Sequence, residues 1–414
     1  MPRRVALITA ALLPLLVSSS GIARTPDVQG FNLIERGRYL ATASDCLACH
    51  TQRPRGKPFA GGRPIETPFG VIVSANITPD QETGIGAWTD DQFDNAVRKG
   101  IKPDGARLYP AMPYPSYTKL SRDDVDAIRA YLQTVEPVRN AVVSNQLPFP
   151  LDIRAAMRAW DKLYFTEGEF KPDPQKSPEW NRGAFLVQGP GHCAACHTPK
   201  TTLGGDKTSE AYRGAPVQGW FAPNITNDER TGIGRWSVDD VATYLKTGHN
   251  KFATATGPMA EEIADSSSHL TDDDLKAMAT YLKSLPSQAD NPAPVAANDP
   301  AMVAGQAIYR DQCSACHGID GKGVAQLFPA LAESPGVRST DPSSLIRVVL
   351  RGARSVATDK EPTGPGMPSY GWQLNDDQVA AVITYIRNAW APAAPAVTAK
   401  QVRKARSDLQ TRSE

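Results

Sequence analysis

All six cysteines of this 414-residue chain lie in three copies of one five-residue pattern, Cys-x-x-Cys-His. The copies stand in DCLACHT at 45–51, HCAACHT at 192–198 and QCSACHG at 312–318. Thiols and imidazoles bind metals, exchange disulfides or hold a prosthetic group, so the chemistry of the chain is expected at these three points. No cysteine is left over, so the pattern accounts for every thiol.

Three kinds of site use such a pattern. A structural zinc site needs a second Cys or His pair close to the first, and the six cysteines leave none. A thioredoxin-like redox motif needs a βαβ setting and does not explain a His after every copy. Attachment of haem c fits all three, because both thiols add to the haem and the next imidazole coordinates iron. The sequence therefore predicts three covalently bound haem c groups, held by Cys46 and Cys49, Cys193 and Cys196, and Cys313 and Cys316, with His50, His197 and His317 as proximal iron ligands.

The sixth iron ligand is expected to be a methionine. Met112 in YPAMPYPSY, Met259 in TGPMAEE and Met367 in GPGMPSY each follow a motif and precede the last helical pattern of its unit. We expect each in a proline-stiffened loop that holds the thioether on iron, a ligation that raises the haem potential. The alternative is that each Met only fills a gap in the core. His249 is a rival ligand in the second unit, although the first unit has Ile101 at that place.

Repeats give the organisation of the chain. The stretch 76–100 returns at 224–248 with 11 of 25 residues identical, so the first two thirds of the chain are a tandem duplication. Each unit has a helical pattern before its Cys pair and a stronger one at its end. The final helices are expected to begin at N-caps with a hydrophobic staple. The N-caps are Ser121, Thr271 and Asn375, and the staple pairs are Leu120 with Val125, Leu270 with Leu275, and Leu374 with Val379.

The repeated stretch also carries polar side chains that could face a haem. They either donate hydrogen bonds to the haem propionates or belong to a turn and the core, and both interpretations stay open. The residues are Asn76, Trp88, Asn224 and Trp236. The third unit lacks this stretch and has VVLRGARS at 348–355, where Arg351 or Arg354 could pair with a propionate.

The N-terminus reads as a secretory leader. Two arginines precede an apolar run of 13 residues, Val5 to Val17, which is too short to span a bilayer comfortably. Small residues follow, so we expect cleavage after Ala23 and export of the rest, with an uncleaved anchor as the alternative. The formal net charge of +1 gives no indication of nucleic-acid binding.

Two helices crossing beside a haem, joined by irregular loops, are the plan of a class I cytochrome c. The repeated NITPDxxTGIGxW pattern, LYPAMPYPSY and the three motifs resemble the tri-haem cytochrome c subunit of bacterial membrane-bound dehydrogenases. The resemblance implies an all-α chain of three tandem class I cytochrome c domains with long irregular loops. We expect a signal peptide at 1–23, cytochrome domains at 24–137, 177–285 and 301–392, a connector at 138–176, a Pro/Ala-rich linker at 286–300 and a charged tail at 393–414.

The same resemblance implies electron transfer rather than catalysis. The cytochrome subunit would sit on the periplasmic side of the inner membrane as a peripheral protein. It would take electrons from a flavin- or quinoprotein dehydrogenase acting on an alcohol, aldehyde, sugar or sugar acid, and pass them to ubiquinone. The family also allows a small chaperone-like third subunit. A freestanding periplasmic electron carrier and a multihaem peroxidase are the alternatives.

The connector holds the one segment in which contact with a membrane or partner is visible. In PLDIRAAMRAWDKLYF, at 150–165, Ile153, Met157, Trp160 and Tyr164 fall at helical spacing on one face. This face either meets a membrane or partner or packs on the protein's own first domain. The tail KQVRKARSDLQTRSE lacks the apolar face of an amphipathic anchor.

Overall fold

The computed structural model describes residues 1, 28–288, 292–390 and 393–411. Residues 2–23 of the predicted signal peptide, with its expected cleavage site, lie outside the described residues. Within the described ranges, the helices are all too short or too polar to cross a bilayer.

The structure contains three helical units, each built on a pair of crossing helices. The pairs are α1 (Val28–Ala43) with α5 (Arg122–Leu132), α7 (Pro178–Gln188) with α11 (Asp272–Lys283), and α12 (Pro300–Ile308) with α16 (Asp376–Ile386). A glycine lies at each crossing, at Gly37, Gly183 and Gly305. A Cβ atom there would fall well inside contact distance of a carbonyl oxygen on the partner helix. The glycines therefore permit the close approach of the two backbones.

The predicted starts of the final helices are confirmed. Ser121 and Asn375 form complete capping boxes, and the six predicted staple residues are buried. Thr271 also accepts a hydrogen bond from the Asp274 backbone, but its box is incomplete. The reason is that the Asp274 carboxylate accepts hydrogen bonds from Arg182 and Tyr39 instead.

The remaining helices lie between the crossing helices or, in the case of the C-terminal helix, after the last of them. Three of them carry the Cys-x-x-Cys-His motifs: α2 (Cys46–Cys49), α8 (Ala194–His197) and α13 (Ser314–His317), the last preceded by a π-helical turn at Tyr309–Cys313. The others are α3 (Asp90–Lys99), α4 (Tyr114–Tyr117), α6 (Met157–Tyr164), α9 (Val238–Thr247), α10 (Pro258–Asp265), α14 (Pro335–Arg338), α15 (Ser343–Arg351) and α17 (Ala399–Thr411), with 3₁₀ turns at Arg154–Ala156, Thr208–Glu210 and Ser267–His269.

The chain also contains strands, which departs from the all-α expectation. Each unit has one antiparallel hairpin of two strands. These are β1 (Pro64–Thr67) with β2 (Gly70–Val73), β3 (Ala215–Val217) with β4 (Trp220–Ala222), and β5 (Ala353–Arg354) with β6 (Gly366–Met367). Strands of two to four residues are too short to give a period-two pattern that a sequence could reveal.

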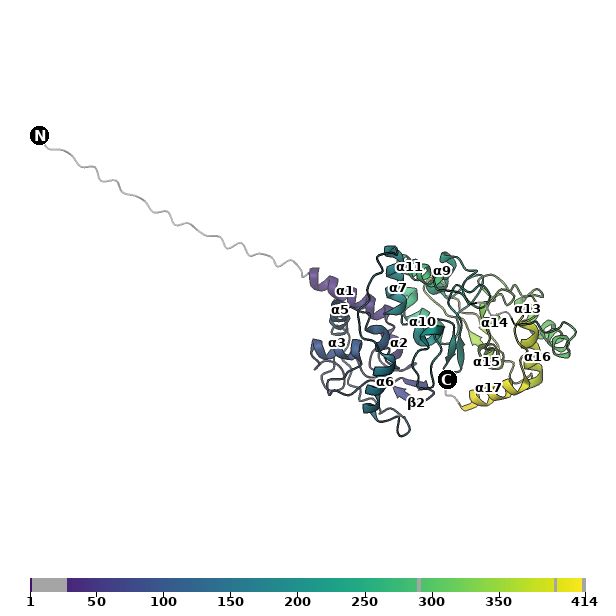
Figure 1. Cartoon of the computed structure of the whole chain (residues 1–414), viewed down its shortest axis with the longest axis horizontal. Coiled ribbons are helices and arrows are strands. Elements are labelled where there is room, and N and C mark those ends of the chain that lie inside the picture. Colours follow the sequence, from purple (N-terminus) through teal and green to yellow (C-terminus); the bar gives the residue numbers. More distant parts are fainter. Residues whose placement is uncertain (2–27, 289–291, 391–392, 412–414) are drawn as a thin grey trace.

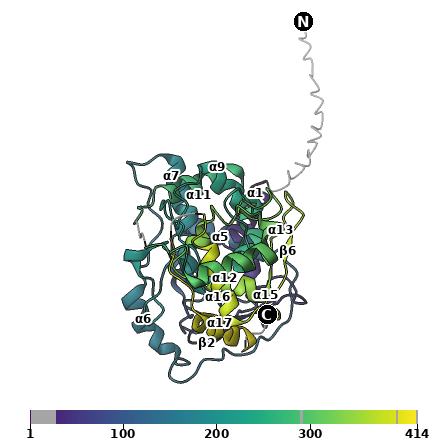
Figure 2. The same ribbon diagram turned by 90° about the vertical axis from the view of Figure 1, so that its right-hand side faces the viewer.

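The second unit lies between the first and the third (Figure 1). Toward the first unit, α10 packs on α2, and Arg63 pairs with Glu261 at 2.6 Å. Toward the third unit, the Phe221 backbone hydrogen-bonds to Ser344. Figure 2 shows α12, α16 and α17 of the third unit facing the viewer, from the right-hand end of Figure 1. The three motifs thus belong to a row of units rather than to a ring.

Two segments outside the repeat pack on the body. In α6, Trp160 and Asp161 are buried, and Tyr114 of the first unit contacts both. The packed interpretation therefore holds for Trp160, whereas Ile153 of the same predicted face is exposed. Helix α17 corrects the prediction that the tail lacks an apolar face, because Val402 and Leu409 are buried in the core of the third unit.

Candidate haem sites

The first cysteine of each motif packs against the core of its unit, whereas Cys316 is exposed. Burial raises the pKa of Cys46, Cys49 and Cys193 to about 12 and that of Cys313 to about 11. A thiol that works in disulfide exchange needs a lowered pKa. The surroundings of these cysteines therefore suit attachment of a group rather than redox exchange.

Each motif histidine is held by the same kind of hydrogen bond. The Nδ1 atoms lie 2.7, 2.6 and 3.0 Å from backbone carbonyl oxygens. The pairs are His50 with Ala75, His197 with Pro223 and His317 with Pro329. A carbonyl only accepts, so Nδ1 carries the proton and Nε2 keeps its lone pair for a metal. Burial lowers the pKa of all three imidazoles, which favours the neutral, ligating form.

The predicted methionines share a hydrophobic cluster with the first cysteine of their own motif. Met112 lies with Cys46, Met259 with Cys193 and Met367 with Cys313. Their local setting differs from the predicted loops in two units, because Met259 lies in the first turn of α10 and Met367 lies in β6. Each unit therefore places its first motif cysteine and its Met in one core, and together with the motif histidine these residues fit the donor set of a six-coordinate haem c.

Side-chain clusters that could bind a metal ion directly are absent from the described residues. In the part of the chain that the structure describes, no three His, Cys, Asp or Glu side chains gather in a way that could hold a metal ion.

Comparison with known proteins agrees with this geometry. The cytochrome c family model matches residues 34–136, 181–286 and 302–390, one segment around each motif. The chain belongs to the cytochrome c family. Cytochromes of this family carry covalently bound haem c, so the predicted cofactor type is confirmed.

Several curated relatives are similar over nearly the whole cytochrome. The gluconate 2-dehydrogenase cytochrome c subunit of Pantoea cypripedii is 41% identical over 96% of this chain and 95% of its own length. The alcohol dehydrogenase (quinone) cytochrome c subunit of Gluconacetobacter polyoxogenes is 40% identical over 94% and 87%. The fructose dehydrogenase cytochrome subunit of Gluconobacter japonicus is 39% identical over 90% and 82%. The predicted resemblance to dehydrogenase cytochrome subunits is confirmed, and it supports an electron-transfer role rather than catalysis.

His249, the alternative iron ligand of the second unit, forms hydrogen bonds with other residues. The Nε2 atom of His249 lies 3.3 Å from the Val356 carbonyl oxygen, and Nδ1 lies 3.4 Å from Thr254 Oγ1. The first contact joins the second and third units. Both ring nitrogens therefore have partners, which favours Met259 as the ligand.

The repeated stretch divides into turn residues and one candidate haem contact. Asn76 and Asn224 hydrogen-bond to Thr83 and Thr231 inside their own loops, as the turn interpretation predicts. Trp236 is different, because its Nε1 is buried and has no hydrogen-bond partner among the described residues. A buried N–H is costly without an acceptor, and a haem propionate would supply one. The unpaired Nε1 of Trp236 thus fits a haem bound in the second unit.

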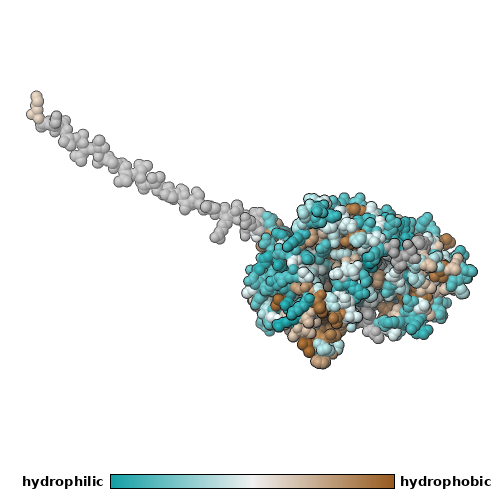
Figure 3. Space-filling model, in the orientation of Figure 1, coloured by the Kyte–Doolittle hydropathy of each residue, from teal (hydrophilic) through white to brown (hydrophobic). Residues whose placement is uncertain are grey.

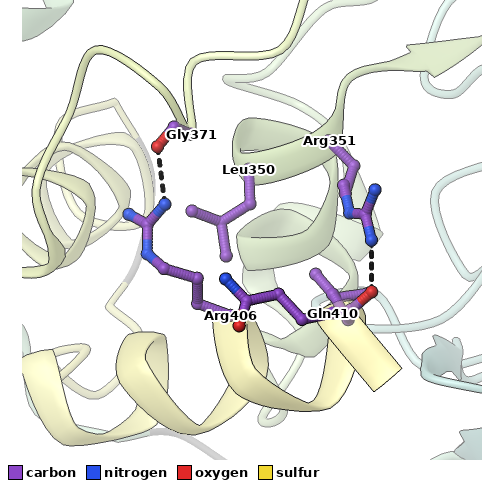
Figure 4. Close-up of a pocket in the computed structure, with 6 residues that line it drawn as sticks. Leu350, Arg351, Gly371, Arg406 and Gln410 are labelled. Atoms are coloured by element: carbon purple, nitrogen blue, oxygen red, sulfur yellow. Dashed lines mark hydrogen bonds between the residues drawn. The ribbon is translucent and has the colours of Figure 1, made fainter. Parts of the chain in front are cut away.

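The arginines of the third unit lie elsewhere than predicted. Arg351 donates to the Leu409 carbonyl on α17, beside a pocket of about 360 Å³ between α15 and α17 (Figure 4). Arg406 on the other side of this pocket donates to the Gly371 carbonyl at 2.6 Å. Arg354 is exposed and contacts the Gly364 carbonyl at 3.4 Å. Arg351 therefore anchors the C-terminal helix, and a propionate role for it is not supported.

Sequence reasoning missed the carbonyls that hold the histidines. They belong to backbone groups of Ala75, Pro223 and Pro329, so no side-chain type marks them. One signal was present in the first two units, where the acceptor directly precedes the Asn of the repeated Asn-Ile-Thr. The side chains that brace the motif backbone were also missed, namely Arg63 on the Ala48 carbonyl and Lys200 on the Ala194 carbonyl.

Proposed function

We propose that this chain is a periplasmic tri-haem c electron-transfer subunit. It carries electrons from a catalytic dehydrogenase that holds a flavin or a quinone cofactor and acts on an alcohol, aldehyde, sugar or sugar acid. It delivers them to ubiquinone at the inner membrane. The observation that carries the proposal is the threefold recurrence of one donor set, thiols, imidazole and thioether, in a row of packed units.

The chain's own residues prepare each site. The thiols would tether haem c, the carbonyl-bound imidazole would offer Nε2 to the iron, and the Met thioether would offer a second ligand. When bound, haem c accepts and releases single electrons. The surrounding apolar cluster would limit the access of water to the group. Every assigned residue therefore serves electron transfer, and none is placed for bond-making chemistry.

The packing of the units suggests an order. The second unit touches both others, through Arg63 and Glu261 on one side and Ser344 and Phe221 on the other. We place it as the relay in the middle. The third unit departs most from the duplication, so we place it nearest the dehydrogenase, which leaves the first unit nearest the quinone.

The relatives support the choice of partner. Those named above are cytochrome subunits of gluconate, alcohol and fructose dehydrogenases, and the chain covers at least 82% of each. A small chaperone-like third subunit belongs to the same proposal. The specific substrate is the property of the catalytic subunit.

Purification from the native membrane tests this function. A tagged chain should bring down a large dehydrogenase subunit, and the complex should reduce a soluble ubiquinone analogue when the substrate is added. Denaturing mass spectrometry should find three covalent haems per chain, and the chain should fractionate with the periplasm and inner membrane. Recovery of the chain alone would favour the freestanding carrier, and a peroxide-induced spectral change would favour the peroxidase.

A further inference from the structure

Several exposed apolar side chains gather at one projecting edge beside α6. Phe149 and Ile153 lie in the loop before α6, and Leu163 lies on its outer face. Their exposed fractions are 80%, 45% and 66%. Leu151 and Leu203 are also exposed, and Leu203 lies beside α6 because its carbonyl accepts from Trp160 Nε1. We call the set formed by Phe149, Leu151, Ile153, Leu163 and Leu203 the apolar tip.

The loop that precedes α6 forms the lowest part of the molecule in Figure 1, and Figure 3 shows a hydrophobic patch there. It is convex, so it offers no groove for a peptide. Exposed apolar side chains clustered in this way mark an interaction site. The buried face of α6 is already used for packing, and of the helix face that the sequence singled out only Ile153, which is exposed, belongs to the tip.

The loop that carries the tip is held outward by the first unit. The Leu151 carbonyl accepts from Tyr109 Oη at 2.9 Å, and the Gln146 and Val71 backbones exchange two hydrogen bonds. Arg154 lies 4.8 Å from the centre of the Tyr109 ring. Because these contacts already fix the loop, its burial in a binding site or a bilayer would cost little conformational entropy.

Charge beside the tip selects the occupant. Arg158 and Lys162 are exposed on α6, and neither forms an ion pair within the described chain. Asp152 is the one acidic residue of the loop 147–153. The acidic residue of α6, Asp161, is buried and lies 3.2 Å from Arg107. Apolar side chains flanked by unpaired cations are the chemistry of a surface that enters the headgroup region of an anionic bilayer.

We propose that the apolar tip inserts into an anionic phospholipid membrane and, with Arg158 and Lys162, sets the first unit against the bilayer. The inference deepens the proposed function, because a carrier that delivers electrons to a membrane quinone must reach the membrane. It places the first unit, at the opposite end of the row from the third, on the lipid side.

Vesicle sedimentation of the haem-loaded chain tests the proposal. The chain should bind vesicles of phosphatidylethanolamine with phosphatidylglycerol, and bind pure phosphatidylcholine more weakly. Substitution Phe149→Ser with Ile153→Ser and Leu163→Ser should weaken binding at least ten-fold, about 1.4 kcal/mol. Arg158→Gln with Lys162→Gln should weaken binding to the anionic vesicles about five-fold per charge and leave binding to phosphatidylcholine unchanged.

The matched control carries Phe31→Ser and Val303→Ser, two exposed apolar side chains away from the tip at 65% and 58%. It should bind as the unchanged chain does. Equal binding by the tip variant, or an equal loss in the control, would overturn the proposal. So would loss of the dehydrogenase from the tip variant with vesicle binding intact, because the tip would then belong to a protein interface. If the unchanged chain binds vesicles but its complex reduces no quinone, the proposed function fails and the membrane contact stands. Unaltered haem absorbance in every variant shows that the sites are intact.

Discussion

The hairpin of each of the first two units leads to the carbonyl that holds the motif histidine, whereas the hairpin of the third unit carries the candidate methionine. In the first two, a hairpin ends just before the carbonyl that holds the histidine, at Ala75 after β2 and at Pro223 after β4. In the third, the carbonyl of Pro329 comes from a loop only 12 residues after His317, and the hairpin instead holds Met367, which pairs with Ala353.

This difference shows which features are required and which are exchangeable. All three units keep the glycine at the helix crossing, the carbonyl on Nδ1 and the Met in the core. The hairpin supports the motif histidine in the first two units and the candidate methionine in the third. The third unit also gains α17, whose Val402 and Leu409 complete its core. We infer that two rigid ligands are needed, and that any short hydrogen-bonded element can supply the rigidity.

The largest expected effect separates the third unit from the other two. Cys313→Ala with Cys316→Ala removes the covalent tether of the third haem. If this unit is nearest the donor, the complex should lose quinone reduction while the dehydrogenase still reduces an artificial dye. Quinone reduction at the native rate would remove the third unit from the path, and loss of the dye activity would show that the unit is needed for assembly.

The second prediction concerns the thioether of the middle unit. Met259→His should keep the iron six-coordinate and lower the haem potential, because imidazole favours ferric iron more than a thioether does. We expect a shift on the order of 0.1 V, well inside the roughly 0.8 V that axial ligands span. A redox titration measures it, with His249→Gln as the control that should leave the potential unchanged. If His249→Gln changes the potential and Met259→His does not, the ligand assignment is wrong.

The third prediction tests whether the helix crossing is common to all units. Gly37→Ala, Gly183→Ala and Gly305→Ala each place a methyl group against a backbone carbonyl that cannot move aside. Each should lower the free energy of unfolding by about 1–3 kcal/mol, as overpacking does. Denaturant unfolding followed by haem absorbance measures the loss.

Gly336→Ala in α14 is the matched control, because its Cβ would lie 3.7 Å from the nearest atom, Ser334 Oγ. It should change stability little. If Gly305→Ala behaves like this control, the third unit does not share the close crossing of the first two.

Local sequence signals predicted much of this arrangement. Features that depend on contacts between distant parts of the chain could not be predicted from the sequence. The Cys-x-x-Cys-His motifs, the caps at Ser121 and Asn375 and the staples were readable because each depends on neighbours within a few residues. The incomplete box at Thr271 was not readable, since it depends on Tyr39 from another unit. The burial of α17 could not be predicted either. The helix has few apolar positions, so its sequence shows no clear apolar face, and these positions are buried only because the core of the third unit packs against them.

The last expected effect appears only as a pH dependence of stability, and it lies at the contact of the first two units. Burial raises the pKa of Glu262 on α10 to about 7 from an ordinary 4.5, although Ser267 donates to its carboxylate at 3.0 Å. Between these pH values the unfolded chain releases a proton that the folded chain retains. The free energy of unfolding should therefore fall as pH rises from about 4.5 to 7, by at most about 1.4 kcal/mol per pH unit, and level off above pH 7.

Glu262→Gln should remove this loss. The free energy of unfolding of the variant should therefore rise relative to that of the unchanged chain as pH rises, as measured by denaturant unfolding at pH 4.5 and 8. The exposed control Glu136→Gln should track the unchanged chain at both values. Parallel curves for Glu262→Gln and the unchanged chain would show that the carboxyl is already ionised across this range.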